Sequence, residues 1–126
     1  MIMAVRTDQP CAELYLLDVK GKESARHAWQ ADRQLAATLL SEITQLLARQ
    51  HTALSDLSGI VVFSGSGSFT GLRIGTTVAN ALAYSLGIPV VKTTDDDWLS
   101  SAESALAKAQ LGQFVQPDYD RAPNIT

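Results

Sequence analysis

Apolar runs separated by polar turns fill the first thirty residues, which is the pattern of consecutive β-strands. The three runs are Ile2–Val5, Cys11–Leu17 and Lys22–Trp29. Within the third run, Ala25, His27 and Trp29 alternate onto one face, as half-buried strand residues do. The polar stretches between the runs, residues 6–10 and 18–21, are turns. We therefore expect an antiparallel meander of three strands.

After residue 31 the apolar positions recur at helical spacing instead. They are Leu35, Leu39, Ile43, Leu46 and Leu47. This spacing predicts an amphipathic helix over Asp32–Gln50. A second helix is predicted over Leu72–Leu86, ended by Gly87 in a left-handed conformation. A third is predicted from its N-cap Thr94 to about Gln110, with Asp95 to Asp97 in its first turn, where the helix dipole favours acidic side chains.

Two further strands lie between these helices. Ile60–Phe63 is a continuous apolar run, typical of a strand covered on both faces. Ile88–Val91 is the other, and Pro89 places it near a strand start or a sheet edge. Because a helix separates the two strands, they should be parallel and joined by a right-handed crossover. The predicted fold class is α/β, a mixed five-stranded sheet with helices in the plan of a ribonuclease-H-like or actin-like ATPase half-domain.

The length of the chain, 126 residues and 13.5 kDa, predicts one domain, which we place at residues 1–112, followed by a C-terminal tail at residues 113–126. The net charge of −3 and scattered basic residues argue against direct binding of nucleic acid. Cys11 is the single cysteine, which excludes an internal disulfide. The apolar runs are too short to span a membrane and no secretory signal is visible, so we expect a cytoplasmic protein.

The Gly/Ser-rich loop at residues 64–75 lies between a buried strand and a helix N-terminus. It is not a P-loop, because no Lys-Ser/Thr pair follows its last glycine, and Thr70 stands where the dinucleotide fingerprint needs a third glycine. Two interpretations fit its local chemistry. It is either a tight strand-to-helix turn capped by Ser68 or Thr70, or a cradle for a phosphate at a helix N-terminus.

The same segment resembles the signature of the TsaB (YeaZ-like) family. The matching residues are Gly65, Gly67, Ser68, Phe69, Thr70, Gly71, Leu72, Arg73, Ile74 and Gly75, with Ser66 in place of the family's usual proline. The resemblance covers about Leu35 to Leu106, and Pro117–Thr126 looks like the family's C-terminal tail. Two departures matter. Arg6-Thr7-Asp8 stands where the family has Asp-Thr-Ser, and most of the family's second lobe has no counterpart in the 126 residues.

The resemblance implies a non-catalytic scaffold subunit for synthesis of threonylcarbamoyladenosine in tRNA. Its partners would be a TsaD-like catalytic subunit and a TsaE-like ATPase near the junction, with a homodimer as another association. No cofactor would bind the isolated chain, although the complex could hold ATP. The interface would lie on the two main helices, at Leu35, Leu39, Gly75, Ala79, Leu82 and Ala83. Alternatively, the small residues among these face the protein's own sheet or first helix, since small residues serve both uses.

The residues offer no self-sufficient active site. Arg6 and Ser64 occupy the strand ends where ribonuclease-H-like nucleases need metal-binding carboxylates, and Asp8 alone cannot hold two metal ions. His27 and His51 show no spacing that indicates ligands or a catalytic base. We therefore predict no catalytic residue and no metal site. The alternative function is a nucleotide- or phosphate-binding enzyme of the actin-like ATPase superfamily that uses the Gly/Ser loop.

Overall fold

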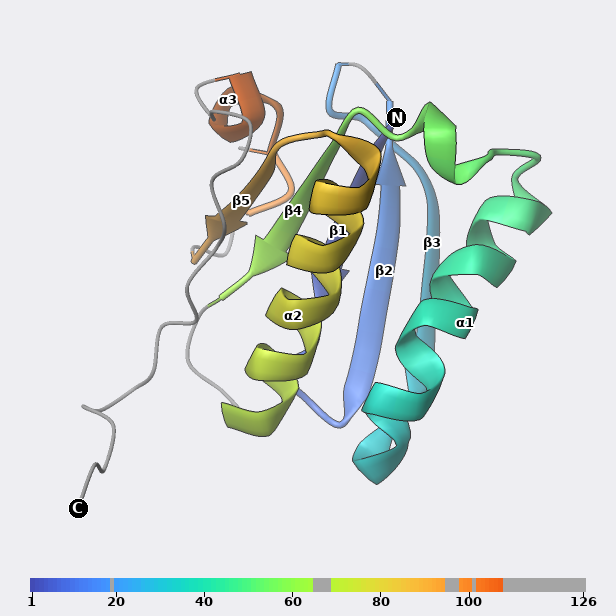
Figure 1. Ribbon diagram of the computed structural model, residues 1–126, viewed down its shortest axis with the longest axis vertical. Coiled ribbons are helices and arrows are strands. Elements are labelled where there is room, and N and C mark those ends of the chain that lie inside the picture. The colour runs from blue at the N-terminus through green and yellow to red at the C-terminus, as the bar shows by residue number, and fades with distance from the viewer. Residues whose placement is uncertain (19, 65–68, 95–97, 101, 108–126) are drawn as a thin grey trace.

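The computed structural model describes residues 1–18, 20–64, 69–94, 98–100 and 102–107. Its centre is one mixed sheet with strand order β3-β2-β1-β4-β5 (Figure 1). The strands are β1 (Ile2–Arg6), β2 (Cys11–Leu17), β3 (Glu23–Gln30), β4 (Gly59–Phe63) and β5 (Val90–Thr93). β1, β2 and β3 form the antiparallel meander, and β1 pairs with β4, and β4 with β5, in parallel. The expected sheet is confirmed.

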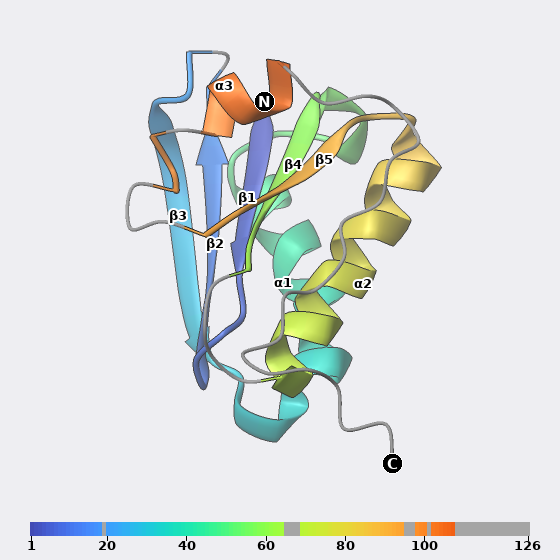
Figure 2. The ribbon, with the colours of Figure 1, turned by 90° about the vertical axis from the view of Figure 1, so that its left-hand side faces the viewer.

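Helices cover the two faces of this sheet unequally. α1 (Leu35–Arg49) and α2 (Phe69–Leu86) lie side by side on one face, and the short α3 (Ala102–Ala107) lies on the other (Figures 1 and 2). Single helical turns at Asp32–Gln34 and Leu54–Asp56 precede α1 and β4. In the second of these turns the carboxylate of Asp56 accepts a 2.8 Å hydrogen bond from the backbone N–H of Ala53.

Two apolar clusters follow from the alternation of side chains across the strands. The larger cluster joins Met3, Val5, Leu14, Ile60 and Val62 of the sheet to the inward faces of α1 and α2. The smaller joins the opposite strand positions, among them Tyr15 and Phe63, to Trp98 and Ala102. Every residue of β4 is buried, as its continuous apolar run predicts. On β3, Ala25, His27 and Trp29 are half-buried while their neighbours are exposed, as predicted.

Several predicted boundaries were wrong. α2 begins at Phe69 rather than Leu72, and β3 spans Glu23–Gln30 rather than Lys22–Trp29. α1 begins at Leu35 rather than Asp32, because Asp32 has a positive φ of 47° and a separate turn precedes the helix. β5 begins at Val90, just after Pro89. Trp98–Ser100 form a turn instead of helix, so α3 starts only at Ala102. The expected first-turn aspartates Asp95–Asp97, Gly112 and the tail at residues 113–126 lie outside the described residues.

Two strand ends and two helix starts lie together at one end of the molecule. The parallel strands β1 and β4 end there, and α1 and α2 begin there, at the bottom of Figure 1. Ligands of open α/β sheets bind beyond the carboxyl ends of their strands. We therefore expect a ligand site at this end of the molecule. The opposite end carries Gly87, which ends α2 at a φ of 67° as its sequence position predicts.

Candidate functional site

The turn after β1 holds an ion pair instead of a metal-binding carboxylate. Arg6 donates to both carboxylate oxygens of Asp8, from Nε at 2.8 Å and from Nη2 at 3.2 Å. The Asp8 side chain is only 2% exposed, and the guanidinium of Arg6 lies 4.1 Å from the centroid of the Phe63 ring. The hydrogen bond to Asp8 raises the pKa of Arg6 above its usual value. The carboxylate of Asp8 is therefore paired with the guanidinium of Arg6 through both oxygens, and it is closed to solvent.

Next to this pair, the turn after β1 packs against the start of α2. Thr7 is buried, and its hydroxyl donates a 2.7 Å hydrogen bond to the carbonyl oxygen of Gly71. Gly75 lies one turn further along α2, and a Cβ atom there would overlap Thr7 Oγ1. The close approach that Gly75 allows is thus with the chain's own β1 turn.

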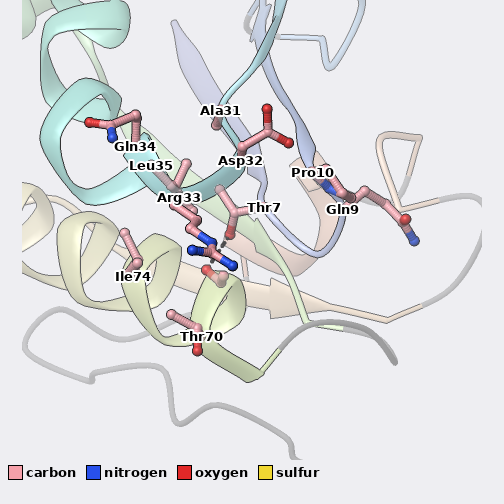
Figure 3. Close-up of a pocket in the computed structure, with 11 residues that line it drawn as sticks. Thr7, Gln9, Pro10, Ala31, Asp32, Arg33, Gln34, Leu35, Thr70 and Ile74 are labelled. Carbon is pink, nitrogen blue, oxygen red and sulfur yellow. Dashed lines mark hydrogen bonds between the residues drawn. The ribbon is translucent and has the colours of Figure 1, made fainter.

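A groove of about 710 Å³ opens beside this contact (Figure 3). Its walls come from three segments: the turn after β1, the turn that precedes α1, and the first turns of α2. Thr7, Arg33 and Thr70 represent these segments, and all three side chains line the groove. Because the three residues are far apart in the sequence, no local pattern indicated this groove.

The residues of the family signature fall partly within this region. Gly65, Gly67 and Ser68, and with them the N-cap predicted at Ser68, lie outside the described residues. Phe69, Thr70, Gly71 and Arg73 form the first turns of α2. The side chains of Thr70 and Arg73 are exposed, whereas Gly71 is buried against Thr7. Within the signature, Gly71 and Gly75 therefore both contact Thr7 of the chain's own β1 turn.

Most of the residues predicted for a partner interface face the interior. Leu35, Leu39, Ala79 and Ala83 belong to the larger apolar cluster, and Ala79 and Ala83 are only 1% and 3% exposed. Gly75 is buried as well, and Leu82 is half-buried against the same cluster. This is the arrangement of the alternative interpretation, in which the small residues face the protein's own sheet and first helix. The five buried residues of this set cannot reach a partner without a change of fold, whereas Leu82 stays partly exposed.

The outer surface of the two helices is a different set of side chains. Within α1 and α2 the only charged residues are Glu42, Arg49 and Arg73. Among the residues that the structure describes, two large apolar side chains are exposed: Leu40 at 51% and Tyr84 at 77%. We call the exposed residues Ala36, Ala37, Leu40, Thr44, Thr77, Ala81, Tyr84 and Ser85 the outer helix surface. Sequence reasoning missed it, although Leu40 breaks the spacing of the core positions.

Neither histidine lies in the groove: His27 contacts neighbouring side chains and His51 is exposed. His27 on β3 pairs with Glu42 on α1 at 2.6 Å and stacks on Trp29, with ring centroids 5.5 Å apart. His51 is exposed just after α1, at a φ of 53°. Among the residues that the structure describes, no group of three His, Cys, Asp or Glu could hold a metal ion. Within the same residues, no helix has the length and apolar character needed to span a membrane.

Comparison with known proteins places the chain in a family. The family model described as TsaD, tRNA N6-adenosine threonylcarbamoyltransferase, matches residues 29–111, which is more than half of the chain. The tRNA threonylcarbamoyladenosine biosynthesis protein TsaB of Bacillus subtilis is 60% identical over 69 residues. The protein of the same name from Escherichia coli is 26% identical over 101 residues. The matched segments cover 54% and 73% of this chain and 28% and 44% of those proteins.

A solved structure agrees with the sequence match. YeaZ from Pseudomonas aeruginosa is 32% identical, with a TM-score of 0.68 over 75% of this chain and 43% of that one. The chain thus spans less than half the length of these relatives. The shared fold and the signature in the first turns of α2 agree with the matched family model. This chain belongs to the TsaB (YeaZ-like) family, within the wider group that the TsaD family model describes.

Proposed function

We propose that this chain is a non-catalytic subunit in the synthesis of threonylcarbamoyladenosine in tRNA, and that it binds a TsaD-like catalytic subunit through the outer helix surface. The relatives from B. subtilis and E. coli are both named as tRNA threonylcarbamoyladenosine biosynthesis proteins. A TsaE-like ATPase would join near the junction, in the cytoplasm. Any ATP would then be bound by the complex, while the isolated chain would bind no cofactor.

The outer helix surface is the observation that carries this proposal. It places Leu40 and Tyr84 in solvent among alanines, serines and threonines, on two adjacent helices with few charges. On α2, Ile74, Val78 and Leu82 are half-buried against the larger apolar cluster and add to the apolar character of this helix. The centres of protein interfaces are depleted of charged residues and enriched in apolar and aromatic ones. Exposed apolar patches on a folded domain usually mark a contact.

The turn after β1 supports the non-catalytic role. A catalytic metal site at the end of β1 would need a free carboxylate there. Asp8 instead accepts both hydrogen bonds from Arg6 and is almost completely buried. Chemistry on the tRNA would therefore be carried out by the catalytic partner, and this chain would contribute binding surface.

Binding to a purified TsaD-like protein from the same cell tests the proposal. Titration calorimetry should show a complex, and Leu40→Glu should weaken it by a factor of roughly a hundred, because an unpaired charge would be desolvated in the interface. Gln45→Glu is the matched control, since Gln45 is an exposed residue of the same helix outside the outer helix surface. Circular dichroism checks that both variants fold. Equal binding by both variants would contradict the proposed surface.

A second measurement addresses the pathway and the alternative function. In cells depleted of their TsaB protein, the chain should restore threonylcarbamoyladenosine in tRNA, measured by mass spectrometry of nucleosides, and Leu40→Glu should not. Titration of the isolated chain with ATP should show no tight binding. Tight ATP binding together with turnover would favour the alternative, a nucleotide-binding enzyme that uses the Gly/Ser loop.

A further inference from the structure

The groove at the start of α1 and α2 has walls that are held in place by hydrogen bonds. On one side, the hydroxyl of Thr7 bonds to the carbonyl of Gly71 and ties the turn after β1 to α2. On the other side, the carbonyl of Pro10 accepts from the backbone N–H groups of Ala31 and Asp32, at 2.9 and 3.1 Å. The same turn after β1 is thus bonded to both other walls. The groove is therefore formed before any ligand arrives, as small-molecule sites usually are.

Arg33 places a positive charge in this groove. It follows Asp32, whose φ of 47° lies in the left-handed region that side chains other than glycine seldom adopt. The side chain of Arg33 extends toward Thr7 and the first turn of α2 (Figure 3). Among the described residues, it has no ion pair or hydrogen bond. A guanidinium carries five N–H donors in a planar fork that matches a carboxylate or a phosphoryl group.

The rest of the lining restricts the ligand. Pro10, Ala31, Leu35 and Ile74 provide an apolar wall, and the exposed hydroxyl of Thr70 stands on α2. Asp32 also lines the groove, and its carboxylate accepts a hydrogen bond from the side-chain amide of Gln30 at 2.9 Å. One arginine beside one carboxylate suits a ligand with a single anionic group and disfavours a polyphosphate. The volume of about 710 Å³ is within the range of small-molecule sites.

We propose that this groove binds a small organic anion, with its carboxylate or phosphoryl group on Arg33 and Thr70 and its apolar body against Leu35 and Ile74. This site is separate from the outer helix surface and does not depend on the proposed partner. Thr70 and Ile74 belong to the family signature, but Arg33 and Leu35 do not, and the two pairs meet only in the folded structure.

Benzoate and phenyl phosphate are suitable probes, because they share one apolar ring and differ only in the anionic group. Added to the isotope-labelled chain, at least one of them should cause saturable amide shifts at residues 7–9, 31–35 and 70–74. Dissociation constants should be roughly millimolar for ligands of this size. Benzamide, the neutral analogue, should cause none. The stronger of the two anions identifies whether the natural group is a carboxylate or a phosphoryl group.

Substitution of the arginine completes the test. Arg33→Gln should weaken binding of the anion roughly tenfold, because a charge-assisted hydrogen bond is lost, and Arg33→Lys should weaken it less. Arg49→Gln removes an exposed arginine from the last turn of α1, outside the groove lining, and should leave binding unchanged. The proposal is overturned if neither anion causes saturable shifts at these residues, or if Arg33→Gln binds as tightly as the unchanged chain.

Discussion

At the scale of single residues, one glycine shows how closely the turn after β1 approaches α2. Replacing Gly75 with alanine would place a methyl group on Thr7 Oγ1 and disturb its bond to Gly71. We expect Gly75→Ala to lower the free energy of unfolding by about 1–3 kcal/mol, despite the higher helix propensity of alanine. Urea unfolding followed by circular dichroism measures the change.

A double-mutant cycle identifies the cause of this loss. In a Thr7→Ala background the hydroxyl is gone, so Gly75→Ala should cost at least 1 kcal/mol less than in the original chain, as about this much coupling is typical of residues in contact. Additive effects of the two substitutions would show that Gly75 is required for a reason other than Thr7.

Tyr15 gives the chain a dependence on alkaline pH. Burial, and then the hydrogen bond that its hydroxyl donates to Glu13, raise the pKa of Tyr15 to about 12. In the unfolded chain this pKa is about 10, so the folded state holds the proton more tightly. The stabilisation is fully present below pH 10 and is lost as the pH rises from 10 to about 12.

Unfolding in urea at pH 9 and pH 11 measures this loss. The free energy of unfolding should fall by about 1 kcal/mol more in the original chain than in Tyr15→Phe, which has no proton to lose. Absorbance of tyrosinate should also show one of the three tyrosines titrating late. An equal fall in both proteins would contradict the pKa shift of Tyr15.

At the scale of elements, the sequence predicts best where one pattern decides the structure. The five apolar positions of α1 and the continuous run of β4 each leave a single arrangement, and both are confirmed. The alanines of α2 allow two arrangements of this helix, because a small side chain fits equally well against the chain's own sheet or against a partner. The third helix starts late because Trp98 packs between Tyr15 and Phe63, a tertiary contact that no local pattern shows.

The candidate site was predicted less well than the elements, for the same physical reason. Arg6 and Asp8 are two residues apart, and their departure from the family pattern was visible in the sequence. The groove joins Thr7, Arg33 and Thr70, which meet only after the sheet and both helices have formed. The exposure of Leu40 has a signal in the sequence, because Leu40 is an apolar residue outside the core spacing of α1.

The burial of Ala83 changes what a charge at this position should do. Ala83 packs in the larger apolar cluster, so Ala83→Glu should lower the free energy of unfolding by several kcal/mol through an unpaired buried charge. Ala81→Glu is the matched control, because Ala81 is exposed two residues earlier on the same helix, and it should change stability by less than about 0.5 kcal/mol. Thermal unfolding distinguishes the two. A stable, folded Ala83→Glu protein would mean that α2 is rotated from the orientation described.

At the scale of the whole molecule, the sheet has an apolar cluster on each face. The larger cluster uses α1 and α2, and the smaller uses Trp98 and α3. The described members of both clusters, with the residues packed against them, come from residues 1–106. Burial of apolar surface is the main source of stability in a domain of this size. The prediction of one domain at residues 1–112 therefore has a physical basis in these two clusters.

A chain that ends at Gly112 tests this prediction of the domain boundary. It should give the same circular dichroism spectrum as the full chain, unfold in one cooperative transition, and melt within about 4 °C of it, which for a domain of this size corresponds to less than about 1 kcal/mol. Binding of the TsaD-like protein should then be measured for both chains. A much lower melting temperature would show that residues 113–126 belong to the folded unit. Equal stability with weaker binding would instead assign the tail to the partner interface, because a segment that adds nothing to the fold can still add contacts in a complex.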